Sequence, residues 1–557
     1  MPTVLAAGVP TVLAAVMPAV VAAVAPRSRR HYAVARTRIH GGLTVPAHDS
    51  PLTVRDGRLW FAGQDLAALG ARLPTPFYLF SGARIAHNCE TVRSAFTRRH
   101  AATEVFFASK ACSALWVLDT VRAAGLGAEV NSGGELWKAL RAGFAPDQIV
   151  FNGVAKTRAE LERAAAAGIR AVVVDSPGEL ERLGAVAREL GVRARVALRV
   201  DVRVPTDTHP GMQTAHGGKF GVDLADAPAL VARARALDGV DVRGLHLHVG
   251  SQIVSVEPYR RAVERALDLV ERVDGDGSSA EGLEFVDVGG GFPVPYVDPG
   301  AERAPGGYFR VTTTPDDYAA VVCEVLQRRR PGLRLFVEPG RFIVSDSAVV
   351  VTRVEMAKTK RLLDGAGEAV GEERWLLLDC GYDTLLDHTF VEWYFRMVVA
   401  GRAAEPADTA FRLGGPLCDS GDVYRGDDDS PYRYLPAATG VGDVVVLRDA
   451  GAYTLDTMTQ YNGRPRAGAY AVDDGRLVCF RRPETYEELV SHDEWPPFSP
   501  VARARRGRAA GARRPPPTAL SPLRVDAGEL VLGARGAELP VHVVVVGGVR
   551  VDDLLAQ

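Results

Sequence analysis

Residues 283–291, LEFVDVGGG, join a short apolar run to three consecutive glycines. The run has the length and β-branched content of a buried strand, and the glycines end it. Seven similar runs lie between residues 104 and 341. The eight predicted strands are Glu104–Ala108, Gly127–Val130, Gln148–Phe151, Arg170–Val174, Arg195–Leu198, Val242–Leu247, Leu283–Val288 and Leu333–Val337. Because amphipathic stretches separate most of them, the pattern predicts an α/β fold, a parallel (β/α)8 barrel of the TIM type.

Polar or glycine residues stand at the predicted end of each strand. They are Lys110, Glu129 with Ser132, Asn152, Asp175, Arg199, His248, Gly289 to Gly291, and Glu338 with Arg341. In (β/α)8 barrels the chemistry lies at the carboxyl ends of the strands. We therefore expect these side chains to meet at one rim of the barrel.

The chain is long enough for two or three domains, since it has 557 residues. After Arg341 the pattern changes to shorter strand-like runs at 348–354, 375–379, 443–447 and 469–472, which predict a β-rich domain. The predicted order is a low-complexity extension (1–50), strands that join the β domain (51–80), the barrel (81–341), the β domain (342–490) and an Arg/Pro-rich linker and tail (491–557).

The composition is that of a globular protein, with 47% apolar and 24% charged residues. Lys plus Arg (66) nearly cancels Asp plus Glu (68), so no overall field favours nucleic acid or a membrane surface. The six cysteines show no CxxC spacing, which argues against a disulfide framework and a zinc cluster and favours a reducing cytoplasm. No metal is expected.

Both ends of the chain have biased composition. Residues 2–26 are rich in Ala and Val, but prolines interrupt them and the arginines follow rather than precede them, so we favour a low-complexity extension over a signal peptide or a membrane span. The six arginines of residues 503–514 predict a solvated tail, with RNA or anionic lipid as the alternative partner.

Four features of the rim suggest a cofactor. Lys110, in FFASKAC, lies beside apolar residues that could lower its pKa and leave a neutral amine for a Schiff base, although most lysines are exposed loop residues. Glu338 could pair with a protonated ring nitrogen, or form a salt bridge with Arg341. The three glycines could form a phosphate nest, or only a turn. With His248 to pack on a ring, these features match the requirements of pyridoxal 5'-phosphate.

Seven segments carry a family resemblance that runs from about Pro76 to Leu489. They are FFASKAC, GLGAEVNSGGEL, LHLHVGSQI, VDVGGGFPV, VEPGR, GGPLCDSGD and GAYTLDTMTQYN. In this order they resemble the fold type III pyridoxal-phosphate amino-acid decarboxylases, most of all diaminopimelate decarboxylase. The resemblance implies a barrel followed by a β domain, an amino-acid substrate that loses carbon dioxide, and a homodimer with shared active sites.

The resemblance also implies roles for individual residues. Lys110 would carry the cofactor covalently, His248 would stack on its ring, and Glu338 would hold the ring nitrogen protonated. Cys418 would enter the partner subunit's site and return a proton to the substrate. The phosphate contacts would come from Ser251, Gly289, Gly290, Gly291 and Tyr453, with Arg341 at the phosphate or the substrate carboxylate and with Glu129 and Arg199 nearby.

The segment GYDTLLDHTFVEWYF departs from the diaminopimelate decarboxylase pattern, in which an Arg-Pro pair and a Tyr bind a distal carboxylate. Here Asp387 and His388 replace the pair. A carboxylate repels a carboxylate, so Asp387 or Glu392 would instead receive the distal amine of ornithine, lysine or a related diamino acid. Asp419 also stands where the family usually has Glu. A specialised siderophore-pathway decarboxylase remains open, and a single alignment gap would move another residue into this place.

Two hypotheses from other functional classes compete with a decarboxylase. An amino-acid racemase would share the barrel and the cofactor, but the segments CDSGD and VEPGR favour decarboxylation. A protein that only binds the cofactor, without catalysis, would leave Lys110 or Cys418 without a task.

Overall fold

The computed structural model describes residues 50–215, 217–275, 282–298, 306–427 and 430–494. These residues belong to one compact unit. The Ala/Val run of residues 2–26 and the arginine run of residues 503–514 lie outside the described residues, as do nearly all of the predicted extension and tail. Within the described ranges, no helix is both long and apolar enough to cross a membrane.

Eight parallel strands close into a ring, as predicted. In ring order they are β5 (Thr103–Ala108), β6 (Gly127–Val130), β7 (Ile149–Phe151), β8 (Ala171–Val174), β9 (Ala194–Asp201), β11 (Val240–His246), β12 (Phe285–Asp287) and β13 (Arg334–Val337). A short strand, β10 (Val222–Asp223), pairs with the end of β9. Each predicted strand overlaps its observed strand, but β9 continues to Asp201, so Arg199 lies within the strand and not after it.

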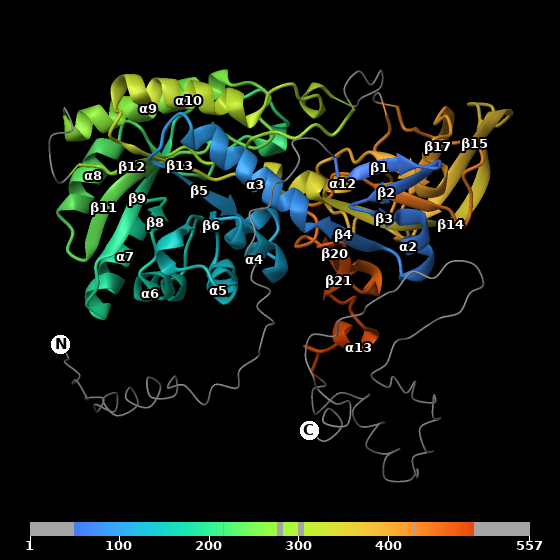
Figure 1. The fold of residues 1–557 in the computed structure, drawn as a ribbon, viewed down its shortest axis with the longest axis horizontal. Helices are drawn as coiled ribbons and strands as arrows, with labels where there is room; N and C mark the ends of the chain where they lie inside the picture. The colour runs from blue at the N-terminus through green and yellow to red at the C-terminus, as the bar shows by residue number, and fades with distance from the viewer. Residues whose placement is uncertain (1–49, 216, 276–281, 299–305, 428–429, 495–557) are drawn as a thin grey trace, which may run out of the picture. The chain divides into compact units, whose positions relative to one another are not determined.

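The barrel helices surround the strands (Figure 1); the first of them precedes β5, and the others each follow a strand. They are α3 (Gly82–Thr97), α4 (Leu115–Ala123), α5 (Gly133–Arg141), α6 (Arg158–Ala167), α7 (Pro177–Leu190), α8 (Ala227–Arg235), α9 (Glu257–Asp274) and α10 (Pro315–Arg329). Side-chain caps start several of them: Ser132, Thr157 and Ser176 accept a backbone N–H from the first turns of α5, α6 and α7. These caps fix where each strand-to-helix loop of the rim ends.

Apolar side chains fill the barrel interior away from that rim. The rings of Phe285 and Phe336 stack with centroids 4.1 Å apart, and Phe106 packs on Phe336 at 5.0 Å. Val150, Ala171, Val173 and Ala197 complete this cluster. The packed interior leaves the carboxyl ends of the strands as the place for polar groups.

The second sheet is built around β4 (Phe77–Ser81), which precedes the barrel, and β14 (Ala348–Leu363), which follows it. Its other strands are β15 (Ala369–Leu378), β16 (Met397–Val399), β17 (Thr409–Gly414), β18 (Arg433–Leu435), β19 (Val444–Leu447), β20 (Gly468–Asp473) and β21 (Arg476–Arg481). Strand β14 is much longer than the predicted 348–354, because its exposed outer half pairs with β15 as a hairpin. The β-rich domain after the barrel is thus present, as predicted.

Residues 52–65 form a separate three-stranded sheet of β1 (Leu52–Arg55), β2 (Arg58–Phe61) and β3 (Gln64–Asp65), followed by α2 (Leu66–Arg72). Leu59 and Phe61 pack in one apolar cluster with Phe77 of β4 and Val349 of β14. Only β4 from this region enters the large sheet by hydrogen bonding, antiparallel to β14 and parallel to β20.

Candidate active site

Lys110 follows β5 in the short 3-10 helix Ser109–Ala111. Its side chain is exposed to solvent, although Glu129, Tyr453 and Glu338 lie close enough to act on its charge. Burial alone would lower the pKa of Lys110, but Glu129, Tyr453 and Glu338 outweigh burial, and the pKa is raised. The expectation that apolar walls lower the Lys110 pKa is therefore wrong, because carboxyl groups stand beside the amine. Lys110 is thus an exposed amine with carboxyl groups beside it.

Glu338, directly after β13, accepts hydrogen bonds from two other strands. The Asn152 amide nitrogen, at the end of β7, lies 2.9 Å from both carboxylate oxygens, and His246 Nε2 lies 3.1 Å from Oε2. Burial alone would raise the pKa of Glu338, but His246 and Lys110 outweigh it and lower the pKa to about 2. The alternative of a salt bridge to Arg341 finds no support among the described residues. Glu338 is held as an anion.

His248 is neutral and faces the glycine loop. Burial, reinforced by the charges of Lys110 and Arg199, holds its pKa well below the usual value. The Gly290 N–H donates to His248 Nδ1 at 3.2 Å, which leaves Nε2 as the protonated nitrogen.

The three glycines allow close packing as much as anion binding. A Cβ on Gly290 would lie 2.0 Å from the Glu338 carbonyl oxygen, and Gly289 and Gly291 have φ values of +67° and +101°. The N–H groups of Gly289 and Gly290 already donate to Asp287 and His248. In the described part of the chain, the Gly291 N–H has no acceptor. The predicted nest of three free donors is thus reduced to one.

Arg341 provides the positive charge of the rim. It opens the short helix α11 (Arg341–Val344); Nε donates to Ser251 Oγ at 3.2 Å and Nη1 to the Tyr296 hydroxyl at 2.9 Å. Its guanidinium also stacks at 4.3 Å on Trp393 and 4.7 Å on Tyr453. Tyr453 has a φ of +60°, and its N–H donates to the Ala111 carbonyl, so this turn of the β domain is fixed beside Lys110. Arg341, Ser251 and Tyr453 together form a positively charged corner of the rim, the Arg341 corner.

Glu129, in β6, and Arg199, in β9, are the other charged residues predicted for the site. Both carboxylate oxygens of Glu129 are buried with no donor among the described residues, and burial raises the pKa of this group to about 8. Arg199 lies over the Phe220 ring at 4.4 Å, and its Nε is 3.9 Å from Asp175 Oδ1. Burial lowers the Arg199 pKa.

The predicted substrate residues fall into two places. Asp387, in α12 (Asp387–Phe390), lies near Arg341, which acts on its charge. Glu392 is exposed and pairs with Arg425 at 3.0 Å. Cys418 and Asp419 lie on an exposed loop, where the Cys418 N–H donates to Asn462 Oδ1 and the Tyr382 hydroxyl donates to Asp419. Within one chain, no hydrogen bond or ion pair of the described residues joins this loop to Lys110.

The structure adds residues that were not assigned to the site from the sequence. Asn152 and His246 bind Glu338, Asp287 lies behind it, and Tyr296 and Trp393 hold Arg341. Asn152 follows a predicted strand and so belongs to the expected rim, but the sequence gives it no partner there. His246 precedes His248 by two residues in LHLHVGSQI, so period-two spacing places it on the same side of its strand as His248. For Tyr296 and Trp393, in loops, the sequence holds no such signal.

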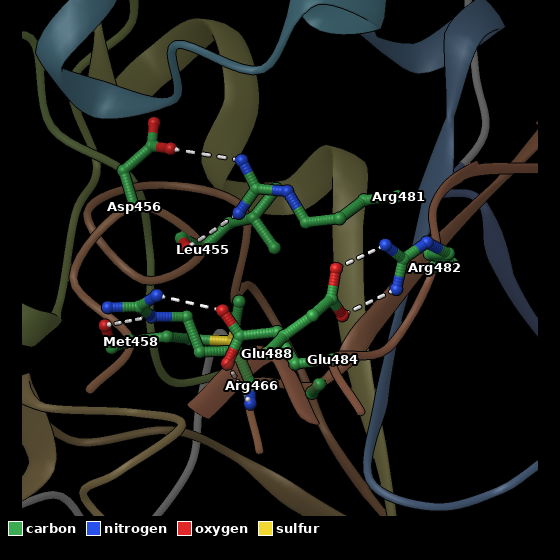
Figure 2. Close-up of a pocket in the computed structure, with 9 residues that line it drawn as sticks. Leu455, Asp456, Met458, Arg466, Arg481, Arg482, Glu484 and Glu488 are labelled. Atoms are coloured by element: carbon green, nitrogen blue, oxygen red, sulfur yellow. Dashed lines mark hydrogen bonds and ion pairs between the residues drawn. The ribbon is translucent and has the colours of Figure 1, made fainter. Parts of the chain in front are cut away.

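A separate cavity of about 450 Å³ lies between the turn after Tyr453 and strand β21. Figure 2 shows its charged side chains facing one another in pairs, with Arg466 on Glu484, Arg481 on Asp456 and Arg482 on Glu488. None of the predicted site residues lines it. Because its charges are mutually satisfied, we do not place the chemistry there.

The rim fits pyridoxal phosphate. Buried polar atoms without a partner among the described residues gather there, namely both Glu129 oxygens, Asn152 Oδ1, His246 Nδ1 and Asp287 Oδ2. An accessible amine suits the cofactor aldehyde, an anion suits its ring nitrogen, and the Arg341 corner suits its phosphate. A barrel rim with these groups, followed by a β domain, defines the fold type III class of pyridoxal-phosphate enzymes.

The chain belongs to the pyridoxal-dependent decarboxylase family. Residues 83–345 match the family model described as "Pyridoxal-dependent decarboxylase, pyridoxal binding domain". The chain is 36% identical to diaminopimelate decarboxylase of Pseudomonas aeruginosa, over 78% of this chain and 97% of that protein. It is 32% identical to that of Archaeoglobus fulgidus, over 79% of this chain and 98% of that protein.

A solved structure agrees with these relatives. The crystal structure of diaminopimelate decarboxylase from M. jannaschii superposes with a TM-score of 0.70 at 29% identity, covering 80% of this chain and 98% of that one. The predicted family, cofactor, fold and enzyme class are confirmed. This chain is a pyridoxal-phosphate-dependent amino-acid decarboxylase similar to diaminopimelate decarboxylase.

Proposed function

We propose that this chain decarboxylates a diamino acid whose distal ammonium is received by Asp387, and that it acts as a homodimer with shared sites. The observation that carries the substrate class is the Asp387 carboxylate. It is half-buried beside the Arg341 corner, and in the described part of the chain no N–H or O–H donates to it. Burial raises the Asp387 pKa, so an arriving cation would relieve the cost of its charge.

Seven residues would hold the cofactor. Lys110 would attach its aldehyde, and Arg341, Ser251, Tyr453 and the Gly291 N–H would take its phosphate. Glu338 would face the ring nitrogen, and neutral His248 would pack on the ring without adding charge. Once bound there, pyridoxal phosphate supplies an electron sink for the pair left behind when the carboxyl group departs.

The reaction then needs a proton on the α-carbon. The bond to the carboxyl carbon breaks, carbon dioxide leaves, and a C–H bond forms in its place. Cys418 is our proposed donor of that proton, acting in the site of the partner subunit, because in its own chain it is exposed on a loop. Mutating Cys418 should abolish protonation but leave cofactor binding intact.

Exposed aromatic side chains around Cys418 support the dimer. Phe390 is 66% exposed and Tyr461 is 46% exposed. Both pack on Tyr382, the residue whose hydroxyl binds Asp419, with ring centroids 5.5 and 5.6 Å apart. Exposed aromatic groups beside a catalytic loop are typical of an interface.

The test of the substrate is a panel of diaminopimelate, ornithine, lysine, arginine and citryl-conjugated diamino acids, with carbon dioxide release as the measurement. Turnover of a substrate with a distal ammonium and no distal carboxylate supports our proposal for Asp387. If diaminopimelate alone reacts, that proposal is wrong.

Diaminopimelate itself is the second candidate, for two reasons. The relatives carry its name, and the M. jannaschii enzyme was solved in co-complex with L-lysine. In this chain, moreover, the Arg425 guanidinium lies 3.0 Å from Glu392, five residues after Asp387, and is a cation able to take a distal carboxylate.

The same assay distinguishes the other candidate functions. A siderophore-type enzyme would prefer the citryl conjugates, and a racemase would invert its substrate without releasing carbon dioxide. The ionised state of Glu338 favours decarboxylation, since it keeps the ring nitrogen protonated and the electron sink strong. We also propose that the enzyme works in a reducing cytoplasm, because all six cysteines are free thiols in the structure.

A further inference from the structure

Two buried carboxyl groups lie together beneath the site. Asp287, the last residue of β12, has no solvent-exposed surface, and Glu338 retains only 4%. One ligand atom each from His246, Asp287 and Glu338 lies within 4.8 Å of the others. Two carboxyl groups this close and this well shielded cannot both ionise without a large cost, so one of them keeps a proton.

The number of donors around each group decides where that proton resides. Glu338 receives the Asn152 amide at 2.9 Å on both oxygens and His246 Nε2 at 3.1 Å. Asp287 receives only the Gly289 N–H, at 2.9 Å on Oδ1, and its Oδ2 is buried with no donor among the described residues. Glu338 receives more hydrogen bonds than Asp287, and these bonds stabilise a negative charge. Glu338 is therefore the carboxylate, and the proton resides on Asp287.

A proton on Asp287 Oδ2 also agrees with the two buried atoms of this cluster that receive no hydrogen bond among the described residues, Asp287 Oδ2 and His246 Nδ1. It turns Oδ2 from an acceptor without a donor into a donor, and one carboxyl oxygen of Asp287 lies within 4.8 Å of one of Glu338. His246 then donates from Nε2 and is neutral, with Nδ1 as its lone-pair nitrogen, which agrees with the missing donor at Nδ1.

We propose that Asp287 is a protonated carboxylic acid whose hydroxyl donates to Glu338, and that it thereby holds Glu338 as the anion facing the cofactor ring nitrogen. Asp287 is then a positioning residue, because it acts through Glu338. This inference rests on the role proposed above for Glu338. The direction of the pKa shifts agrees, since burial and Glu338 raise the Asp287 pKa well above its usual value.

The charged and titratable groups that face this pair come from four other strands of the ring. They are Lys110 after β5, Glu129 on β6, Arg199 on β9, and His246 and His248 at the end of β11. Glu129, with a pKa raised to about 8 by burial, adds little negative charge at neutral pH. The two cations and the neutral histidines leave Glu338 as the main anion of the cluster.

Infrared difference spectroscopy on the cofactor-free protein tests the proton directly. A protonated carboxyl group has a C=O stretch distinct from that of a carboxylate. The wild-type minus Asp287→Asn spectrum should contain this band at neutral and mildly alkaline pH. A Glu129→Gln difference serves as the control, because its band should disappear as the pH rises through about 8. Absence of an Asp287 band would overturn the proposal, whatever reaction the enzyme catalyses.

Two variants test the consequence in the cofactor-loaded enzyme. Asp287→Ala removes a donor from a buried charge and should weaken cofactor binding by roughly 10-fold or more and shift the pH dependence of the cofactor's visible absorbance. Asp287→Asn keeps a donor of similar shape and should recover most of that loss. If the Asn variant is as impaired as the Ala variant, Asp287 acts as an anion and the proposal fails; it fails equally if neither variant changes cofactor binding. Loss of the proposed substrate activity alone, with the infrared band present, would contradict the proposed function and not this inference.

Discussion

Glu338→Gln offers a quantitative test of the site. In the structure the Glu338 pKa falls from 4.5 to about 2, since His246 and Lys110 outweigh the effect of burial. A change of that size corresponds to ~3 kcal/mol in favour of the anion. Glutamine has the same shape but cannot carry the charge, so it gives up this stabilisation. We expect kcat to fall by about 100-fold or more, because removing one preorganised group that stabilises developing charge in a shielded site typically has an effect of that size.

The assay is carbon dioxide release from the best substrate of the panel, with cofactor affinity measured in parallel by absorbance titration. Glu104→Gln is the matched control. Glu104 lies in β5 at the opposite end of the barrel, where it pairs with Arg170 at 2.7 Å and Arg334 at 2.9 Å, and its substitution should leave kcat within about twofold. If Glu338→Gln keeps kcat within tenfold of wild type at saturating cofactor, the ring-nitrogen role of Glu338 is refuted.

Three further predictions concern the dimer, the substrate and pH. Lys110→Ala and Cys418→Ala subunits should each be inactive alone. When they are mixed in equal amounts and reassembled, half of the dimers should hold one intact shared site out of two, so about a quarter of wild-type activity should return. If no activity returns, Cys418 does not act across the interface. Asp387→Asn should raise KM for a diamino acid by roughly 30-fold, from loss of a desolvated ion pair, while the exposed Asp408→Asn control should not; an unchanged KM would exclude Asp387 from the distal contact. Glu129 has a pKa of about 8 in the folded protein and 4.5 as a free group. Between these two pH values the folded protein binds more protons than the unfolded protein, so the cofactor-free protein should lose stability as the pH rises from about 4.5 to 8. Thermal unfolding of Glu129→Gln should show a shallower decline over that range, and an identical decline would show that Glu129 titrates normally.

The barrel could be predicted because each of its strands is buried and therefore reads as a short apolar run between helices with recognisable caps. The β domain was only partly predictable. The outer half of β14 is exposed and rich in lysine, so it has no apolar pattern, and β16 and β18 have three residues each. Strand length there depends on pairing between strands distant in sequence.

The candidate site was likewise only partly predictable from the sequence. Lys110, Glu338 and the glycines could be singled out because they end strands and suit a known cofactor. The contacts of Asn152 and His246 with Glu338 could not be predicted, because Asn152 is 186 residues away and His246 is 92 residues away, and only the closed ring brings these strand ends together. The raised Lys110 pKa was missed for a similar reason: the flanking sequence is apolar, but Glu129 and Glu338 come from other strands.

The central claim is that the Lys110 amine carries the cofactor. Treatment of the cofactor-loaded enzyme with borohydride, followed by digestion and mass spectrometry, should find the reduced pyridoxyl group on the peptide that contains Lys110, and no such peptide in Lys110→Ala. A pyridoxyl group on a different lysine, or none at all in a protein that still releases carbon dioxide, would contradict the account.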